Sequence, residues 1–249
     1  MVKFFRKIRY DIMEKNKTGK YFKYALGEIV LVMIGILLAL QVNNWNNSRI
    51  EQNEENEVLV KLNADFKENK KVLNKFLIEI NNQSNSQCTL MSLIGVSKEE
   101  LDKQNLDSLF YVTFGASEFA FADNTIKNIM QSGKLNLLKS EKITDLFYKW
   151  NTLSEVRTRR MTKLDDWANT QFIPYLIDKI SFKQMDKRSN YSWTGKSKIK
   201  PDYYPLFQDI AFENFLDNHL WYNQQVIERC EETGKLIDKI IEATEPSTK

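Results

Sequence analysis

The sequence predicts a mainly all-α protein, in which one N-terminal transmembrane helix precedes an exported helical-bundle domain with a long first helix. Three observations support this prediction. Glycine and proline, which turn-rich β folds need often, number only 8 and 4 among 249 residues. Twelve consecutive apolar residues run from Ile29 to Leu40. Farther along the chain, apolar residues recur at steps of three and four, the spacing of one helix face.

The positive charge of the chain is concentrated at its N-terminal end. Residues 1–28 contain eight Lys and Arg and three acidic residues, so this segment carries +5. The remaining 28 basic and 30 acidic residues give −2. Phosphate binding requires a positive excess that the large domain lacks, so nucleic acid is excluded as a partner. The apolar fraction of 42% also excludes a disordered chain.

Residues 24–44 are predicted to be a membrane-spanning helix. The run Ile29–Leu40 alone reaches about 18 Å, but the longer segment supplies about 30 Å, the thickness of the hydrocarbon core. Tyr24 and Trp45 lie at its two edges, where interfacial aromatic rings are found. The lipid bilayer is therefore the first expected partner. The alternatives are a buried core helix, a cleaved signal peptide and a helix on the membrane surface.

The distribution of charge predicts the orientation of this span. Basic residues lie in the short segment before it, and the positive-inside rule places such segments in the cytoplasm. Residues 1–23 are thus expected to be a cytoplasmic juxtamembrane segment, and residues 45–249 an exported, periplasmic domain. Phe4, Phe5, Ile8 and Ile12 recur at helical spacing among the basic residues. Either a surface-bound amphipathic helix or a disordered basic tail fits this pattern.

One face of the predicted span contains Glu28, Gly35 and Ala39, which are seven and four residues apart. Gly35 and Ala39 form a small-xxx-small pair, which permits close helix contact. This face is a candidate interface for self-association or for a protein partner, sheltering Glu28. The alternative is that Glu28 reaches the headgroups by itself and the small pair has no role.

The exported domain is predicted to begin with a long helix over about residues 48–82. Asn69 occupies one core position of a heptad pattern in this helix. Packing within the same domain and a coiled coil both fit the pattern. The apolar heptad positions are Leu59, Leu62, Phe66, Leu73, Phe76 and Ile80.

The remaining segments are predicted from caps, turns and periodicity. Residues 81–85 favour a turn, residues 110–121 either a short strand or an irregular segment, and residues 181–204 little helix. Ser97 to Glu100 fits a capping box. Helices are expected over 124–130, 140–169, 172–180, 210–220 and 221–243.

Two segments resemble an uncharacterised bacterial family of small membrane-anchored proteins that contain a domain of unknown function. The first is KFFRKIR followed by YALGEIVLVMIGILLALQVNNWNN, over residues 3–9 and 24–47. The second is IMQSGKLNLLKSEKITDLFYKW, over residues 129–150, with the Ser-Gly-x-Leu turn of that family. The resemblance covers about a quarter of the chain. It implies a location in the bacterial inner membrane and implies no catalytic residue.

Residue types that carry catalysis or bind metals and cofactors are sparse. His219 is the single histidine, and it has no nucleophile in a recognisable motif beside it in sequence. No metal site, phosphate loop or cofactor motif is present in the sequence, so none is predicted. Cys88 and Cys230 are either a disulfide of an exported domain or two free buried thiols.

Residues 183–204 combine six Lys and Arg residues with aromatic rings, which suggests a surface-binding loop. Its rings are Tyr191, Trp193, Tyr203 and Tyr204. Exposed rings beside cations bind sugars, anionic polymers or proteins. The alternative is a solvated loop whose rings pack on the core.

The sequence therefore favours a non-enzymatic interaction or scaffold module of the cell envelope, acting through the span or the exported helices. A membrane-anchored small-molecule sensor that signals through a partner is the alternative. A third hypothesis is an enzyme whose site is assembled from scattered carboxylates. A closed pocket with a few polar groups would favour the sensor, whereas an exposed apolar patch without such a pocket would favour the scaffold.

Overall fold

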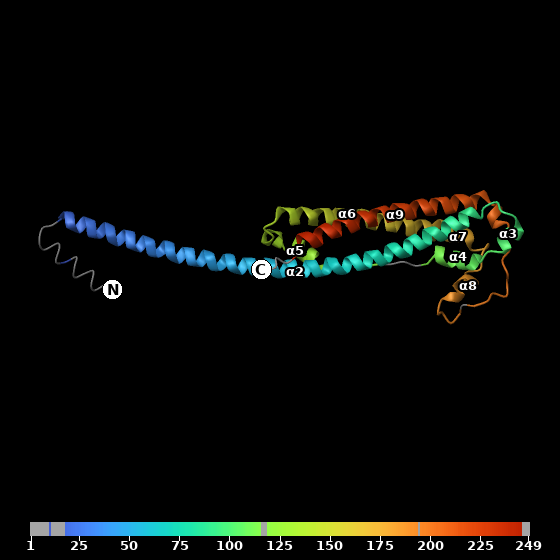
Figure 1. Cartoon of the computed structure of the whole chain (residues 1–249), viewed down its shortest axis with the longest axis horizontal. Helices are drawn as coiled ribbons and strands as arrows, with labels where there is room; N and C mark the ends of the chain where they lie inside the picture. Colours follow the sequence, from blue (N-terminus) through green and yellow to red (C-terminus); the bar gives the residue numbers. More distant parts are fainter. Residues whose placement is uncertain (1–9, 11–17, 116–118, 194, 246–249) are drawn as a thin grey trace. The chain divides into compact units, whose positions relative to one another are not determined.

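The computed structural model describes residue 10 and residues 18–115, 119–193 and 195–245. These residues form helices and connecting loops without a strand, which confirms the all-α prediction (Figure 1). The α-helices are α2 (Thr18–Ser92), α3 (Lys98–Asp102), α4 (Leu106–Thr113), α5 (Asn124–Gln131), α6 (Glu141–Trp167), α7 (Ile173–Leu176), α8 (Phe182–Met185) and α9 (Ile210–Ala243). The 3-10 turns are η1 (Lys134–Leu137), η3 (Asp186–Arg188) and η4 (Leu206–Gln208), and η2 (Ala168–Phe172) is a π-helical turn.

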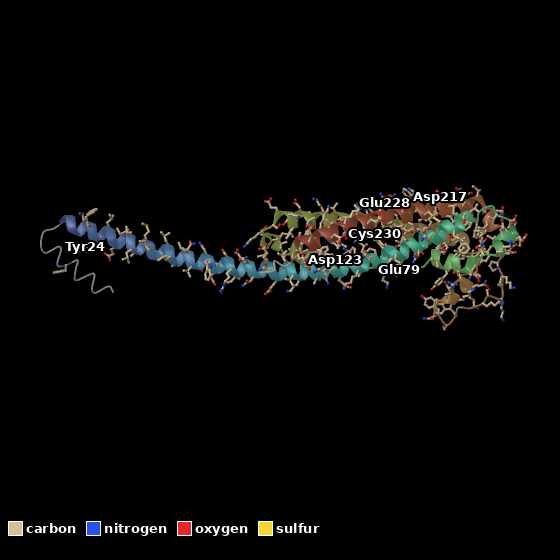
Figure 2. The ribbon with its side chains drawn as sticks, in the orientation of Figure 1. Tyr24, Glu79, Asp123, Asp217, Glu228 and Cys230 are labelled. Atoms are coloured by element: carbon tan, nitrogen blue, oxygen red, sulfur yellow. The ribbon has the colours of Figure 1, made fainter. Side chains whose placement is uncertain are left out.

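Contacts divide the chain into two compact units, residues 1–57 and residues 58–249, and the division falls within α2. In the first unit, the side chains of the apolar run Ile29–Leu40 are exposed, and they project on all sides of the helix (Figure 2). Among the described residues, α2 is the one helix long and apolar enough to cross a membrane. Its apolar window is not buried at all, unlike the core helix of a soluble protein.

In the second unit, the apolar stripe of α2 packs with α6 and α9 around the first of two core clusters. Five of the predicted heptad positions are buried, namely Leu62, Phe66, Leu73, Phe76 and Ile80. The stripe therefore packs within its own domain. The helices α6 and α9 lie side by side (Figure 1), and α9 runs antiparallel to α2, since Leu73 lies against Gly234 while Gln87 bonds Asn223.

A second core cluster lies around the end of α2 and contains many phenylalanine rings. Leu90 and Leu101 join rings from α4, from η2 and from the start of α9. The ring of Phe110 contacts several others at centroid distances of 5.8 to 6.5 Å. Buried aromatic pairs of this kind add about 0.5–1.5 kcal/mol each beyond their burial. The cluster therefore anchors the short helices to the bundle.

Asn69, at a core position of the heptad, is fully buried. Its side chain donates to the Ala122 carbonyl at 3.1 Å and accepts from the Ala122 N–H at 2.7 Å. The loop before α5 has no secondary structure to satisfy these backbone groups, and an unpaired buried amide is costly. Asn69 thus replaces a backbone partner, which explains a polar residue in an apolar stripe.

The predicted capping box is confirmed, because Ser97 and Glu100 cap α3. In α5, Asp123 occupies the N-cap position without a side-chain cap bond. Gly133 follows this helix with φ of 70°, a conformation that favours glycine. The predicted boundary at residues 220–221 is wrong, because α9 continues unbroken from Ile210 to Ala243.

Two other local predictions are wrong. The polar run at residues 81–85 is helical, and α2 continues to Ser92. The reason is tertiary, since Ser86, Gln87 and Leu90 are buried and their contacts outweigh the turn propensity of the run. The strand alternative for residues 110–121 is also wrong for the described part, because α4 extends to Thr113 and residues 119–123 form a loop.

Candidate functional site

The second unit contains a cavity of about 350 Å³, partly open to solvent, between α2, α4, α6 and α9. This volume is at the lower end of the range for small-molecule sites. Its walls combine apolar and polar side chains that come from sequence positions 76 to 226. The lining residues are Phe76, Ile80, Gln83, Thr113, Phe114, Gly115, Met161, Leu164, Asp165, Ala168, Asn169, Ile173, His219, Asn223 and Val226.

Three buried polar atoms of this lining have no hydrogen-bond partner among the residues that the structure describes. They are the Oγ1 of Thr113, the Nδ1 of His219 and the Oδ1 of Asn223. The three residues are only 2%, 5% and 1% exposed. Each unsatisfied buried group costs about 1–3 kcal/mol, and proteins hold few of them. Such groups are retained in few places in a folded protein, so three in residues of one lining make this region a candidate site.

His219 lies among aromatic rings at the inner wall of the cavity. Its ring stacks on Phe114 at 5.9 Å and meets Phe172 edge to face at 5.5 Å. Burial lowers the pKa of His219 to about 4, so the imidazole is neutral near pH 7. A neutral imidazole with so low a pKa is a weak base, and it is better suited to a hydrogen bond than to proton transfer.

The mouth of the cavity is formed where the α6 helix widens into the π-helical turn η2. Asp165 and Asn169 are exposed there, and Ala168 lines the wall. Pro174 follows shortly after this turn, and a proline ring lacks the N–H donor and clashes with the carbonyl four residues earlier. The wider turn accommodates this break, and such turns occur often at functional sites.

The lining contains no catalytic arrangement that the described residues support. Thr113 and His219 are not joined by a hydrogen bond, and no cysteine or serine lines the cavity. Within the described ranges, no group of three or more His, Cys, Asp or Glu side chains is placed to hold a metal ion. The arrangement can bind and orient a small molecule through hydrogen bonds and apolar contact.

Among the sequence-predicted site residues, Glu28, Gly35 and Ala39 lie in the apolar part of α2. Gly35 and Ala39 are exposed, and a Cβ added at Gly35 would meet nothing within 4 Å. Glu28 is partly buried. The helix face they share therefore stays a prediction as an interface. The predicted amphipathic helix of residues 4–12 lies almost wholly outside the described residues.

The two cysteines are free, with Cys88 exposed and Cys230 buried, which contradicts the disulfide alternative (Figure 2 labels Cys230 on α9). The antiparallel register places Cys230 opposite a part of α2 about ten residues before Cys88, or about 15 Å along the helix axis. A disulfide requires Cα atoms within about 7 Å.

The four rings of the predicted surface-binding loop have different environments. Tyr191 and Trp193 are exposed and stack on each other at 4.7 Å. Tyr203 instead packs on the core, stacked on Phe110 at 5.8 Å, and Tyr204 is partly buried against the same cluster. The structure therefore leaves a surface pair rather than a four-ring surface.

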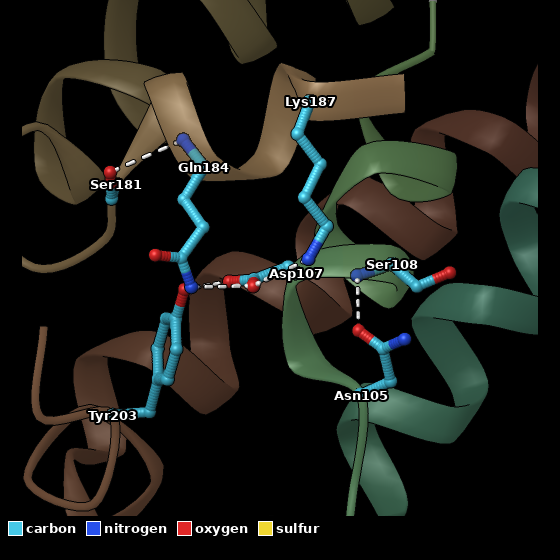
Figure 3. A network of polar contacts seen from close by, with 7 residues as sticks. All are labelled: Asn105, Asp107, Ser108, Ser181, Gln184, Lys187 and Tyr203. Atoms are coloured by element: carbon cyan, nitrogen blue, oxygen red, sulfur yellow. Dashed lines mark hydrogen bonds and ion pairs between the residues drawn. The ribbon is translucent and has the colours of Figure 1, made fainter. Parts of the chain in front are cut away.

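The loop is attached to α4 through the carboxylate of Asp107 (Figure 3). Tyr203 donates to its Oδ1 and Gln184 to its Oδ2, both at 2.6 Å, while the Lys187 ammonium lies 3.5 Å from Oδ2. Burial alone would raise the pKa of Asp107, but these hydrogen bonds and the lysine charge together hold it below its ordinary value of 3.8. Both carboxylate oxygens of Asp107 are bonded to groups of the same loop, so this network holds the loop against α4.

Arg157 of α6 is buried, although it lies close in sequence to Arg159 and Arg160. Its guanidinium is 4.4 Å from the centroid of Phe121 and 5.8 Å from that of Trp150, and it donates to Ser154 at 2.9 Å. Cation–π contact stabilises a charge buried in this way. In the sequence, only the aromatic residues Phe119 and Phe121 indicated that rings were available to surround a buried cation.

No family model, curated protein or solved structure matches this chain. The resemblance of residues 3–9, 24–47 and 129–150 to a membrane-anchored family therefore stays a prediction. The cavity and the apolar helix are the features of the structure that bear on function.

Replacing Thr113 by Val is expected to stabilise the ligand-free protein by about 1 kcal/mol, because it removes a buried hydroxyl without a partner and keeps the side-chain shape. Chemical unfolding of the full chain in detergent measures this change. Thr158→Val is the matched control, since its hydroxyl is exposed and bonds the Ser154 carbonyl. A Thr113→Val protein less stable than the parent would contradict the unsatisfied hydroxyl.

Replacing Asp107 by Asn is expected to cost about 1–3 kcal/mol at neutral pH, with a pH dependence set by the lowered pKa. A carboxylate with a lowered pKa stabilises the fold above its unfolded pKa, and this contribution is lost as pH falls through the folded pKa. The unfolding free energies of the parent and the variant should therefore begin to converge as pH falls below about 4, and should meet once the pH is below the lowered pKa of Asp107. Asp166→Asn at an exposed position is the control, and a difference that persists undiminished in acid would contradict the network.

Proposed function

We propose that the chain is a single-pass protein of the bacterial inner membrane whose exported helical domain binds a small molecule and performs no catalysis. In this proposal residues 1–23 are cytoplasmic, residues 24–44 span the bilayer and residues 45–249 are periplasmic. Ligand binding is relayed through a protein partner. The cavity with three unpaired buried polar atoms is the observation that carries the proposal.

The membrane location is supported by the exposed apolar side chains of α2. The large apolar side chains from Ile29 to Leu40 are 42% to 67% exposed, with Val30 the least and Leu31 the most exposed. A continuous apolar surface of this length is unfavourable in water and favourable in lipid. The charge excess of +5 in residues 1–28 supports the orientation.

The cavity favours the sensor hypothesis over the scaffold hypothesis that the sequence alone favoured. A scaffold needs an exposed apolar patch on the domain. The exposed large apolar side chains of the domain come from several separate segments of the chain, namely Val60, Ile78, Tyr148, Ile177, Tyr191, Trp193, Ile199, Ile210 and Trp221. The cavity instead is lined by residues from α2, α4, α6 and α9, which are far apart in sequence. Three buried polar atoms of these lining residues have no hydrogen-bond partner among the described residues. Binding energy from a ligand would offset this cost.

The native cysteines provide a test of orientation. A membrane-impermeant maleimide added to bacterial cells with a permeabilised outer membrane should label Cys88, which is exposed. Cys230 should stay unlabelled, because it is buried and burial raises its pKa to about 12. Cys88→Ser should abolish the signal. Labelling that requires disruption of the inner membrane, or extraction of the chain by alkaline carbonate, would contradict the proposed topology.

The binding function can be tested through the small molecules that accompany the protein. The full chain is purified in detergent and denatured, and the released compounds are identified by mass spectrometry. The same is done with Ala168→Phe, whose added ring would occupy the cavity that Ala168 lines. At least one compound should be enriched in the parent protein. Thr162→Phe is the matched control, since it adds a ring at an exposed position of α6 outside the lining. Identical compounds from all three proteins would contradict binding in the cavity.

A further inference from the structure

The basic loop, defined here as residues 183–193 and 195–202, carries a positive charge that the rest of the second unit lacks. The segment from 183 to 202 contains six Lys and Arg and two Asp, which gives +4. The rest of the chain after residue 28 then has 22 basic and 28 acidic residues, or −6. Together with α8, this loop projects from the helical bundle (Figure 1). The excess of positive charge is therefore local and lies on a protruding part of the domain.

Five of the six cations in the basic loop have no ion pair with a described residue. Lys187 is the exception, since its ammonium lies 3.5 Å from Asp107. Asp202 of the same loop is paired with Lys98, outside the loop, at 3.1 Å. The five cations without an ion pair are all exposed, namely Lys183, Arg188, Lys196, Lys198 and Lys200. Their charges are therefore open to an anionic partner.

Exposed apolar side chains accompany these cations. Tyr191 and Trp193 stack with their rings nearly parallel, and they are 57% and 67% exposed. Ile199, which has a lysine on either side in sequence, is 82% exposed. The Gly195 N–H donates to the Lys183 carbonyl at 3.4 Å, which holds the two arms of the loop together. Cations and exposed apolar groups thus share one short loop.

This combination fits the surface of an anionic bilayer better than it fits a protein or a glycan. Trp and Tyr rings, which have one polar edge, are enriched at the headgroup level of bilayers. An exposed isoleucine gains from contact with the acyl boundary, whereas a hydrated glycan offers it no apolar phase. Five of the six cations are lysines, a residue type that is depleted in protein–protein interfaces but attracted to anionic lipid surfaces.

We propose that the basic loop binds the phosphate headgroups of an anionic bilayer, with Tyr191, Trp193 and Ile199 at the headgroup level and the lysines around them. This contact is separate from the predicted span and does not depend on the cavity, so it goes beyond the proposed function. The Asp107 network holds the loop against α4. Lipid contact would therefore fix the exported domain, as well as the loop, at a bilayer surface.

Binding is measured with the full chain in nanodiscs of phosphatidylcholine, which accept the predicted span and carry no net charge. Vesicles of phosphatidylcholine alone, or with about 30% phosphatidylglycerol, are then added. Flotation on a density gradient at about 100 mM salt separates the vesicles with their bound protein. The protein should float with the anionic vesicles and remain behind with the neutral ones. At about 1 M salt, where charges are screened within 3 Å, binding to the anionic vesicles should be lost.

Replacing three lysines of the loop by alanine assigns the electrostatic part of the binding. Lys196→Ala, Lys198→Ala and Lys200→Ala should each weaken binding about fivefold, and the triple variant about a hundredfold. Lys187 is left unchanged because it contacts Asp107. The matched control removes the same charge from exposed positions of α6 and α9 and should bind like the parent; its positions are Lys142, Lys163 and Lys239.

Replacing the two rings assigns the interfacial part. Tyr191→Ala combined with Trp193→Ala should weaken binding about tenfold, because the rings no longer bury apolar area among the headgroups. The control variant combines Tyr148→Ala with Trp221→Ala, which are exposed rings outside the loop at 54% and 51%, and it should bind like the parent. An unchanged midpoint of thermal unfolding shows that each loop variant is folded.

Three results would overturn the proposal. The first is equal flotation with neutral and anionic vesicles, and the second is an equal loss of binding in the loop and control variants. The third is complete displacement from anionic vesicles by polygalacturonate at the same concentration of negative charge, which would assign the loop to a carboxylated glycan instead. Binding that is unchanged in the variant without Tyr191 and Trp193 would overturn their place at the headgroup level. These results are independent of the compounds released from the cavity.

Discussion

The antiparallel register of α2 and α9 is held by contacts at several levels, and the rest of the bundle is arranged around it. Asn63 donates to the Ile241 carbonyl at one end. Leu73 lies against Gly234 farther along, and Gln87 then accepts a hydrogen bond from Asn223. Both amides of this last contact are almost fully buried. Their bond uses one polar atom of each residue, and a shift of one residue along either helix would leave both unpaired at a cost of several kcal/mol. The other helices pack on the pair that this register defines.

The same contact shapes the cavity. Asn223 donates to Gln87, and its buried carbonyl oxygen has no hydrogen-bond partner among the described residues. His219 lies one helical turn earlier, and its buried Nδ1 also has no partner there. The bundle thus carries unsatisfied polar groups where an apolar core would be more stable. A folded domain has only about 5–15 kcal/mol of stability, so retaining these groups is a substantial cost that a bound ligand would offset.

The helix that carries the apolar segment also supplies part of the cavity wall. Phe76, Ile80 and Gln83 line the cavity, and they belong to the same α2 helix as Ile29 to Leu40. Under the proposed function, a ligand that contacts these residues touches a helix that reaches the membrane. Its contacts with that helix would differ between the two conformations of the domain. A ligand shifts a conformational equilibrium only by its differential affinity for the two states. In the proposed function, contacts of a ligand with α2 would therefore contribute more to a signal than contacts with the loop held by Asp107.

The sequence by itself determined the features that depend on local spacing. Periodicity of three and four specified the helices and the buried stripe from Leu62 to Ile80, and Ser97 and Gly133 marked helix ends through their own hydrogen bonds and φ angle. The apolar run and its basic flank were equally visible. These signals are readable because each one involves residues within a few turns of each other.

Only the tertiary structure decided the features that depend on pairing between distant residues. Thr113, Asp165 and His219 are separated by more than fifty residues each, so no spacing rule joins them in one cavity. Contacts between helices make residues 81–85 helical and bury Arg157 among aromatic rings. They also place Tyr203 on the core, against Phe110, while Tyr191 stays exposed. The physical reason is that desolvation and hydrogen-bond pairing at these positions are set by neighbours from other helices, and those neighbours are fixed by the register of α2 and α9.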